Sequence, residues 1–142
     1  MLATGTPNKD VVRQFVERYQ VENDQDAFEE ILSPDLVDHS PMPGIAPGRD
    51  GVHMLFDAFH AAFEGFRAEI YDQVAEGDRV VTRKAFFGRH VGPFMGMPAT
   101  EKDVRIDVID IVRVREGRIV EHWNIVDQLS LLRQLGAIPE AG

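Results

Sequence analysis

The hydrophobic period changes midway along the chain, and this change limits the fold more than any other feature. In the first half, apolar side chains such as Val12, Phe15 and Tyr19 recur every three or four residues, the spacing of one helix face. From Phe66 onward, apolar and polar side chains alternate over long stretches rich in β-branched residues, as in strands. Helices followed by consecutive strands predict an α+β fold, with helices on one face of a curved antiparallel sheet.

Turn and capping signals divide the two halves into elements. Thr6-Pro7 is typical of a helix start, because a hydroxyl caps the first turn and proline loses no hydrogen bond there. Ser33-Pro34 ends the second helix, and Glu116-Gly117 is a signal for a tight hairpin. The predicted helices span 6–19, 27–32, 52–63 and 129–135, and the predicted strands span 36–39, 66–74, 79–91, 104–115 and 118–126.

Composition narrows the class of protein. A chain of 142 residues, 44% of them hydrophobic, fits a single domain, 1–142, with a core of its own. It has no cysteine, which excludes disulfides, thiolate metal sites and cysteine nucleophiles. With 24 acidic against 15 basic residues, its net charge of −9 argues against nucleic-acid binding. No apolar run approaches the roughly 20 residues of a membrane helix, and residues 1–10 do not look like a signal peptide, so we expect a cytoplasmic protein.

Two sequence blocks are distinctive in combination. The first is GRHVGPFMGMPAT at 88–100, and the second is GRIVEHW at 117–123, followed by Asp127 and by RQLG at 133–136. Together they resemble the SnoaL-like polyketide cyclase family of the nuclear-transport-factor-2-like (NTF2-like) superfamily. The resemblance extends from about residue 8 to residue 136.

The resemblance implies a cone-shaped fold, with three N-terminal helices packed on the sheet around a pocket. Family cyclases close a ring of an aromatic polyketide ester by intramolecular aldol condensation, without a metal or organic cofactor. In the family, an acid–base carboxylate lies on the last strand and an assisting histidine on its neighbour. Matched to this chain, the carboxylate position falls on Asn124, the histidine position on Asp110, and a polar asparagine of the first strand on Asp38.

This departure matters because an amide cannot accept a proton at neutral pH. Either a carboxylate and an amide have exchanged places on two adjacent strands, or the aldol activity has been lost. Asp110 stands in an apolar strand, where it is either a pocket base or a structurally paired acid. His122 and Asn124 share a strand face, and His122 could pair with Asp110 across the hairpin or simply pack. These three are the predicted catalytic residues.

The predicted substrate-binding residues each have a structural alternative. Asp38 and His39 point to opposite faces of a short strand, so only one of them lines a cavity. Trp123 has the opposite parity to His122 and could instead be a core or interface anchor. Asp127 is well placed to cap the closing helix. The other candidates are His90, which could hold the following loop, and Phe94 and Met97, which form a lid or a plug.

His53, Asp57 and His60 lie on one face of the third helix with metal-competent spacing. Such residues more often form a solvated polar flank, and we predict no metal site. Apolar residues at both parities of 104–114 predict a covered outer sheet face and hence a homodimer.

The leading hypothesis is therefore a cyclase acting on a small hydrophobic, polyketide-like molecule. Asp110 is its base, His122 its proton carrier, and Asn124 its donor to the enolate. The alternatives are a dehydratase, isomerase or epoxide hydrolase in the same pocket, or a non-catalytic ligand-binding dimer.

Overall fold

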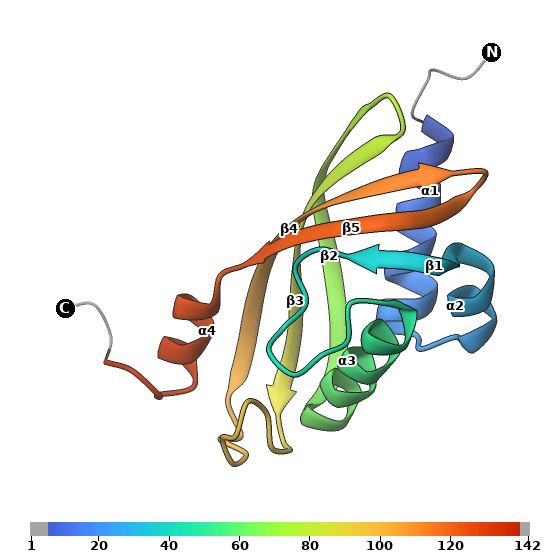
Figure 1. The fold of residues 1–142 in the computed structure, drawn as a ribbon. Helices are drawn as coiled ribbons and strands as arrows, with labels where there is room; N and C mark the ends of the chain where they lie inside the picture. The colour runs from blue at the N-terminus through green and yellow to red at the C-terminus, as the bar shows by residue number, and fades with distance from the viewer. Residues whose placement is uncertain (1–5, 140–142) are drawn as a thin grey trace.

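The computed structural model describes residues 6–139 and consists of a curved sheet with helices packed against one face (Figure 1). The side chain of Thr6, predicted to cap the first helix, and residues 1–5 lie outside the described part. The elements are α1 Thr6–Gln14, the π-helix η1 Phe15–Val21, α2 Gln25–Ile31, β1 Leu32–Asp38, α3 Arg49–Ala62, β2 Phe63–Glu76, β3 Arg79–His90, β4 Asp103–Arg115, β5 Arg118–Val126 and α4 Gln128–Gln134.

The strands form one sheet in the order β1-β5-β4-β3-β2. The three hairpin-linked pairs are antiparallel, whereas β1 pairs with β5 in parallel. The predicted α+β fold with a curved sheet is confirmed, but this edge is parallel. No hairpin turn links β1 to β5, so its direction was not fixed by local sequence. The prediction that Ser33-Pro34 ends the second helix is wrong, because α2 ends at Ile31 and both residues lie within β1. Pro34 is tolerated within β1 because an edge strand has one side without ladder hydrogen bonds.

Aromatic side chains hold α3 against the sheet. The ring of Phe59 is central, with ring centroids 5.2–6.2 Å from those of Phe56, Phe63, Phe66, Phe86 and Phe94. Each such pair adds about 0.5–1.5 kcal/mol beyond its buried area. This cluster joins α3 to β2, β3 and the loop after β3, and so forms one wall of the space between helices and sheet.

A β-bulge in β5 decides which of its side chains face the helices. Ile119 is in register with Val114 and Glu121 with Arg113, so Val120 is an extra residue. Because of it, both Ile119 and His122 face inward, although their spacing in sequence is odd. Without the bulge, the side chain of Trp123 would take the inward position.

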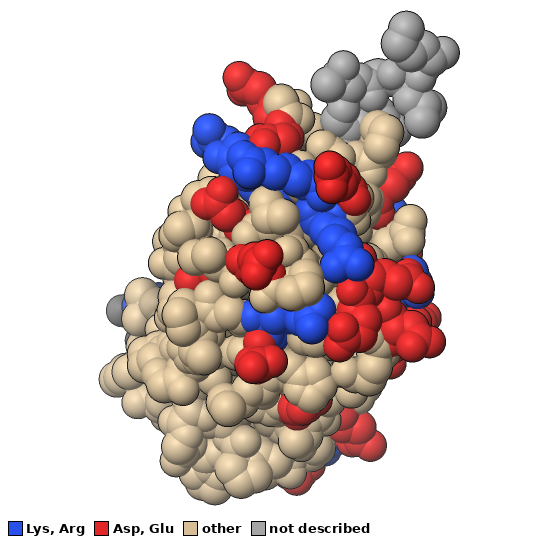
Figure 2. All heavy atoms as spheres, turned by 45° about the vertical axis from the view of Figure 1, so that its right-hand side comes forward, with Lys and Arg blue, Asp and Glu red and all other residues tan. Residues whose placement is uncertain are grey.

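The surface is charged, and acidic and basic side chains are interspersed. Figure 2 shows Lys and Arg lying among Asp and Glu on one face. Arg113 illustrates such pairing, at 2.7 Å from Asp78 and 2.8 Å from Glu121. The hydrogen bond from Arg113 holds the pKa of Asp78 below its usual value. No helix of the described residues 6–139 is long and apolar enough to span a membrane.

Candidate active site

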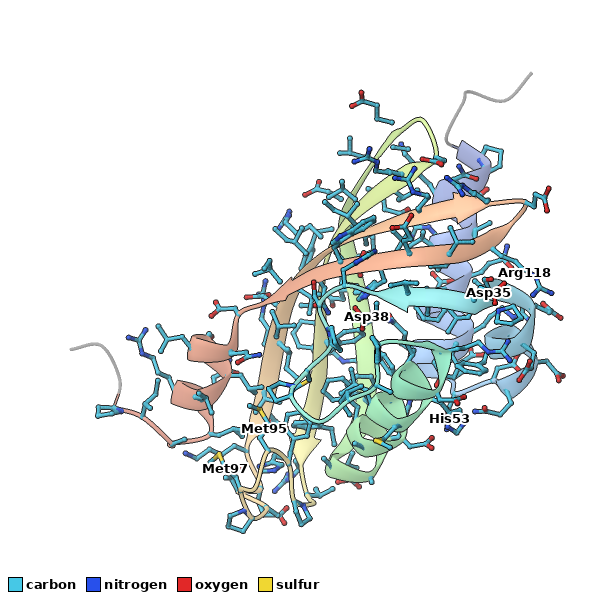
Figure 3. All side chains as sticks on the ribbon, in the orientation of Figure 1. Asp35, Asp38, His53, Met95, Met97 and Arg118 are labelled. Carbon is cyan, nitrogen blue, oxygen red and sulfur yellow. The ribbon has the colours of Figure 1, made fainter. Side chains whose placement is uncertain are left out.

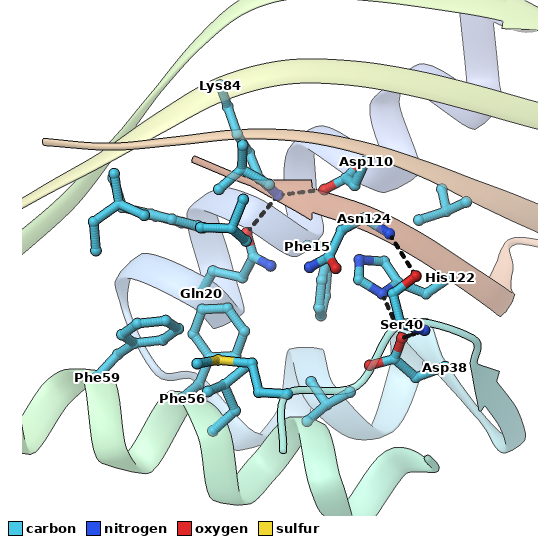
Figure 4. A pocket seen from close by; sticks show the side chains of 18 of the residues that line it. Phe15, Gln20, Asp38, Ser40, Phe56, Phe59, Lys84, Asp110, His122 and Asn124 are labelled. Carbon is cyan, nitrogen blue, oxygen red and sulfur yellow. Dashed lines mark hydrogen bonds and ion pairs between the residues drawn. The ribbon is translucent and has the colours of Figure 1, made fainter. Parts of the chain in front are cut away.

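The inward-facing residues of three neighbouring strands form the floor of a pocket between sheet and helices. Strand alternation places Lys84 of β3, Asp110 of β4, and both His122 and Asn124 of β5 on this face. Asp38, at the end of β1, joins them from the edge of the sheet. Charged and polar side chains from four strands therefore converge on one space (Figure 4).

The rest of the lining is mostly apolar. Counted out to its open mouth, the pocket holds about 910 Å³ free of protein atoms. The apolar lining consists of Phe15, Leu32, Leu36, Met42, Val52, Leu55, Phe56, Phe59, Phe86, Phe94, Met95, Ile106, Val108, Val112, Ile119, Val126 and Leu131.

Asp110 and Lys84 form a buried ion pair in this pocket. Nζ of Lys84 lies 2.7 Å from Oδ2 of Asp110, and the two side chains are only 2% and 4% exposed. The same Nζ donates to Oε1 of Gln20 at 3.1 Å. Each group offsets the burial of the other, since a lone buried charge would cost several kcal/mol.

The second carboxylate oxygen of Asp110 has no hydrogen-bond partner among the described residues, although it is buried. An unpaired buried acceptor costs about 1–3 kcal/mol. Natural proteins satisfy most such atoms. Four remain unpartnered among the described residues, and Oδ1 of Asp110 is the one that belongs to a pocket-lining residue. Oδ1 of Asp110 can accept a hydrogen bond or a proton from a bound molecule.

A second polar pair joins β1 to β5. Nδ1 of His122 lies 3.2 Å from Oδ1 of Asp38, and the backbone N–H of Ser40 donates to the same oxygen at 2.9 Å. Burial alone would raise the pKa of Asp38, but these hydrogen bonds outweigh burial and lower it. An ionised Asp38 accepts the Nδ1–H of His122, which leaves Nε2 with no partner among residues 6–139. This is the arrangement of an oriented acid–base histidine.

Asn124 supplies an amide beside both pairs. Its backbone N–H donates to Oγ of Ser40 at 3.3 Å, which fixes the strand against the loop after β1. None of the hydrogen bonds found within residues 6–139 uses its side-chain amide. Asn124 can therefore donate a hydrogen bond to a ligand oxygen.

The sequence-predicted Asp–His pair exists with a different acid. His122 pairs with Asp38, whereas Asp110 pairs with Lys84. Lys84 and Gln20 were missed in the sequence. The signal for Lys84 was its parity, because it alternates with the buried Thr82 and Phe86 on β3. A lysine on a buried strand face requires an acidic partner, and the inward-facing Asp110 is that partner.

Two predicted substrate-binding residues face away from the pocket. His39 and Trp123 stack on the opposite side of the sheet, with ring centroids 4.6 Å apart and planes within 10°. His39 also pairs with Glu121 at 2.9 Å. Both predictions are corrected by strand parity: each residue is adjacent in sequence to an inward-facing one, Asp38 and His122 respectively.

His90 has a structural role. It is fully buried, and its Nδ1 accepts the backbone N–H of Thr100 at 3.2 Å and lies 3.0 Å from Oγ1 of Thr100. It therefore closes the base of the loop between β3 and β4 and does not line the pocket. Asp127 likewise caps α4 by accepting the N–H of Ser130 at 3.0 Å, and it lies outside the pocket.

The loop 91–102 contributes one predicted residue and one that was not predicted. Phe94 lines the pocket, whereas Met97 packs against the core and Met95 takes the lining position. Phe94 and Met97 exchange two backbone hydrogen bonds, so the turn between them has positive φ at Met95 and Gly96. That turn directs Met95 toward the pocket, and Figure 3 shows both methionines in this loop.

The three polar residues of α3 do not form a common site. His53 pairs with Asp57 at 3.2 Å, while Nε2 of His60 lies 2.8 Å from the backbone oxygen of Gln20. His60 is thus an anchor for η1 and not part of a solvated flank. Within residues 6–139, no three His, Cys, Asp or Glu side chains are grouped so as to hold a metal.

The curved five-stranded sheet, with helices that enclose an apolar pocket against it, is the α+β fold of the NTF2-like class. The model of the family described as SnoaL-like polyketide cyclase matches residues 9–135, and the chain belongs to that family.

The relatives are similar over most of their length. Aklanonic acid methyl ester cyclase DauD of Streptomyces sp. (strain C5) is 34% identical, covering 92% of this chain and 83% of DauD. Nogalonic acid methyl ester cyclase of Streptomyces nogalater is 30% identical, covering 78% of this chain and 84% of that protein. Among solved structures, TsrD from Streptomyces laurentii has a TM-score of 0.84 at 30% identity, covering 97% of this chain and all of TsrD. IdmH from Streptomyces antibioticus has a TM-score of 0.80 at 34% identity, covering 91% and 98%.

Proposed function

We propose that this protein is a polyketide ester cyclase, which closes a carbocyclic ring by intramolecular aldol condensation. The observation that supports it best is the unpartnered oxygen of Asp110 in an apolar pocket. Two relatives are named as cyclases of polyketide methyl esters. A base that removes a proton beside a carbonyl must present a free, ionised oxygen to an otherwise apolar substrate.

In the proposed reaction, Oδ1 of Asp110 removes a proton from the carbon between two carbonyl groups. The electron pair of that C–H bond forms the enolate, whose carbon attacks a ketone carbon of the same molecule. The new alkoxide takes a proton from Nε2 of His122, which enters this step as the imidazolium with its Nδ1–H donated to Asp38. The amide of Asn124 donates a hydrogen bond to an enolate oxygen. One C–C bond forms. Asp110 then releases to solvent the proton that it took, and His122 regains from solvent the proton that it gave.

The residue types differ from the family pattern at two positions. In that pattern the last strand holds the carboxylate, and here that position is Asn124. Asn124 and Asp110 are register partners on β5 and β4, so the carboxylate has moved to the adjacent strand and stays on the same face. This arrangement supports retention of acid–base chemistry with exchanged positions over loss of the base.

The direct test is deuterium uptake at the α-carbon of an aryl β-keto ester in heavy water. We expect the wild-type protein to accelerate uptake and Asp110→Asn to abolish it. Asp107→Asn is the matched control, because Asp107 lies on the same strand with its side chain paired to Arg105 outside the pocket. Uptake at the uncatalysed rate with wild-type protein, for a panel of such esters, would contradict the proposal.

Product analysis separates the proposed cyclase from other enzymes in the same pocket. Aklanonic and nogalonic acid methyl esters are the first substrates to supply, because they are the named substrates of the relatives. A cyclised product of unchanged mass is expected. Loss or gain of water, or turnover of epoxides alone, would indicate a dehydratase or epoxide hydrolase. Binding without any product would indicate a ligand-binding protein.

Homodimerisation through the outer face of the sheet is also proposed. Ile109 and Ile125 are register partners on β4 and β5, and they are 50% and 78% exposed. Two adjacent exposed isoleucines on a sheet face favour burial against another surface. The cytoplasmic location stays a prediction from sequence.

A further inference from the structure

One buried charged group of the pocket, the ammonium group of Lys84, has no role in the proposed reaction. Lys84 is 2% exposed and projects from β3 into the pocket. Lysine is almost never buried to this extent unless it is paired. Lys84 is paired, but the pair is incomplete on both sides.

The unused hydrogen-bonding groups belong to the two residues of the ion pair. An ammonium group has three N–H donors, and two of those of Lys84 are directed to Asp110 and Gln20. The remaining N–H has no oxygen partner among the described residues, and only the face of Phe86 is near, with Nζ 5.2 Å from the ring centroid. Oδ1 of Asp110 also has no partner. The pocket floor thus offers one free donor beside one free acceptor.

We propose that Lys84 is a further catalytic residue, which donates a hydrogen bond to the carbonyl oxygen that becomes the enolate. This inference rests on the proposed cyclase function and names its substrate group as a 1,3-dicarbonyl, such as a β-keto ester. Oδ1 of Asp110 takes the proton from the carbon between the two carbonyls. The electron pair of that bond moves onto the carbonyl oxygen, where the ammonium of Lys84 stabilises the developing negative charge.

The arrangement of Lys84 and Asp110 suits a bound 1,3-dicarbonyl better than it suits a purely structural ion pair. A structural pair requires hydrogen bonds to its remaining atoms, because otherwise the cost of burying two charges exceeds their attraction. Here the unfilled atoms belong to two residues that line the pocket. An enolisable dicarbonyl supplies both an oxygen acceptor for Lys84 and an acidic hydrogen for Asp110, and its second oxygen remains for the amide of Asn124.

Gln20 is the positioning residue for Lys84. It lies in the π-helix η1, and its backbone oxygen is anchored by His60 at 2.8 Å. π-Helical segments are rare and frequently occur at functional sites. Oε1 of Gln20 accepts the hydrogen bond of Nζ of Lys84, which limits the positions that the ammonium group can take (Figure 4).

The test compares Lys84→Met with Lys102→Met, a matched change at an exposed lysine. Deuterium uptake by a β-keto ester is measured as kcat and KM, after circular dichroism has shown that each variant is folded. Removing one oxyanion donor lowers kcat by about 10²–10³-fold. We expect that loss for Lys84→Met, with a smaller change in KM and no change for Lys102→Met. Wild-type kcat in folded Lys84→Met would overturn the inference.

A second measurement covers the case in which Lys84→Met does not fold because Asp110 is left unpaired. Asp110→Asn and the double variant Asp110→Asn/Lys84→Met are titrated with methyl 1-hydroxy-2-naphthoate, an aromatic analogue of an enolised β-keto ester. The absorption of the bound phenolate is expected with Asp110→Asn and is expected to vanish with the double variant. The same phenolate spectrum in both would overturn the role of Lys84.

This titration also separates failure of the inference from failure of the proposed function, because it does not require turnover. Wild-type protein without deuterium uptake would refute the proposed function alone. Sodium borohydride treatment of the wild-type protein with a β-keto ester adds a further check. A reduced adduct on Lys84 would overturn the inference, because it would mean that Nζ forms a covalent imine and does not act as a hydrogen-bond donor.

Discussion

His122 and Asp38 are partners at two levels of structure. Their Cα atoms are in register between the parallel strands β5 and β1, and Nδ1 of His122 lies 3.2 Å from Oδ1 of Asp38. The parallel edge strand is thus what brings the acid to the histidine. Because Nδ1 is hydrogen-bonded to Asp38, Nε2 remains for proton transfer. The role of His122 as proton donor can therefore be tested separately from the role of Asp110 as base.

His122→Gln should impair ring closure while sparing enolisation. If His122 protonates the alkoxide, its loss lowers the rate of cyclisation by about 10²–10⁴-fold, the usual contribution of a general acid. Deuterium uptake at the α-carbon should change little, because Asp110 removes that proton. Both rates are measured with the same methyl ester substrate, by chromatography and by mass spectrometry.

His39→Gln is the control for this experiment. His39 follows Asp38 in the sequence, but its side chain pairs with Glu121 on the outer side of the sheet. It should leave both rates unchanged. A parallel fall of uptake and cyclisation in His122→Gln would mean that His122, and not Asp110, is the base.

The pairing also predicts how stability depends on pH. The pKa of Asp38 in the folded protein lies below its ordinary value of 3.8, so folding favours the ionised form. The stabilisation is therefore fully present above about pH 4 and is lost as the pH falls through the lower folded pKa. Asp38→Asn has no such group to titrate.

We therefore expect the difference in free energy of unfolding between wild type and Asp38→Asn to be largest near neutral pH and to shrink below about pH 3. Urea unfolding at a series of pH values measures it. Asp35→Asn is the control, because Asp35 is an exposed residue of the same strand. A difference that stays constant across this range would show that Asp38 does not stabilise the fold through its charge.

Local signals in the sequence were sufficient for most of the fold. The Glu116-Gly117 turn predicted the hairpin of β4 and β5, and both residues have the positive φ that such a turn needs. Strand alternation placed His122 and Asn124 on one face, and the structure finds both of them, together with Asp110, in the lining of the pocket. These features depend on neighbours in the chain, which a sequence displays directly.

The pairing within the site depends on contacts between distant segments. Asp38 and His122 are 84 positions apart, and they meet only because β1 joins the sheet in parallel. Gln20 reaches Lys84 across 64 positions from a π-helix that has no clear sequence signal. Residue types therefore indicated acid–base chemistry, whereas the partners of each acid required the tertiary fold.

Ile125→Glu should dissociate the proposed homodimer. A carboxylate at the centre of an apolar interface would be buried without a partner, which is strongly unfavourable. Analytical ultracentrifugation should give half the wild-type mass at the same concentration. Met54→Glu is the control, since Met54 is 57% exposed on α3 and outside the sheet face. A wild-type mass already equal to that of one chain would refute the dimer.

The exchange of a carboxylate and an amide between strands can be reversed by mutation. Asp110 and Asn124 are register partners, so Asp110→His with Asn124→Asp restores the residue types of the family pattern on the same two positions. Asp110→His alone removes the base and should lose nearly all cyclase activity. The double variant should recover part of it, because a carboxylate again faces the substrate from the adjacent strand.

Asn124→Asp alone should raise cyclase activity above that of the wild type. This gain should be smaller than the gain that the same change produces in the Asp110→His background. The single variant places two carboxylates side by side, and mutual repulsion raises the pKa of one of them, so that one protonates. Gln128→Glu adds a carboxylate at another pocket position and serves as the control. Product formation from aklanonic acid methyl ester is measured for each variant. A folded double variant no more active than Asp110→His would show that the two strand positions are not interchangeable.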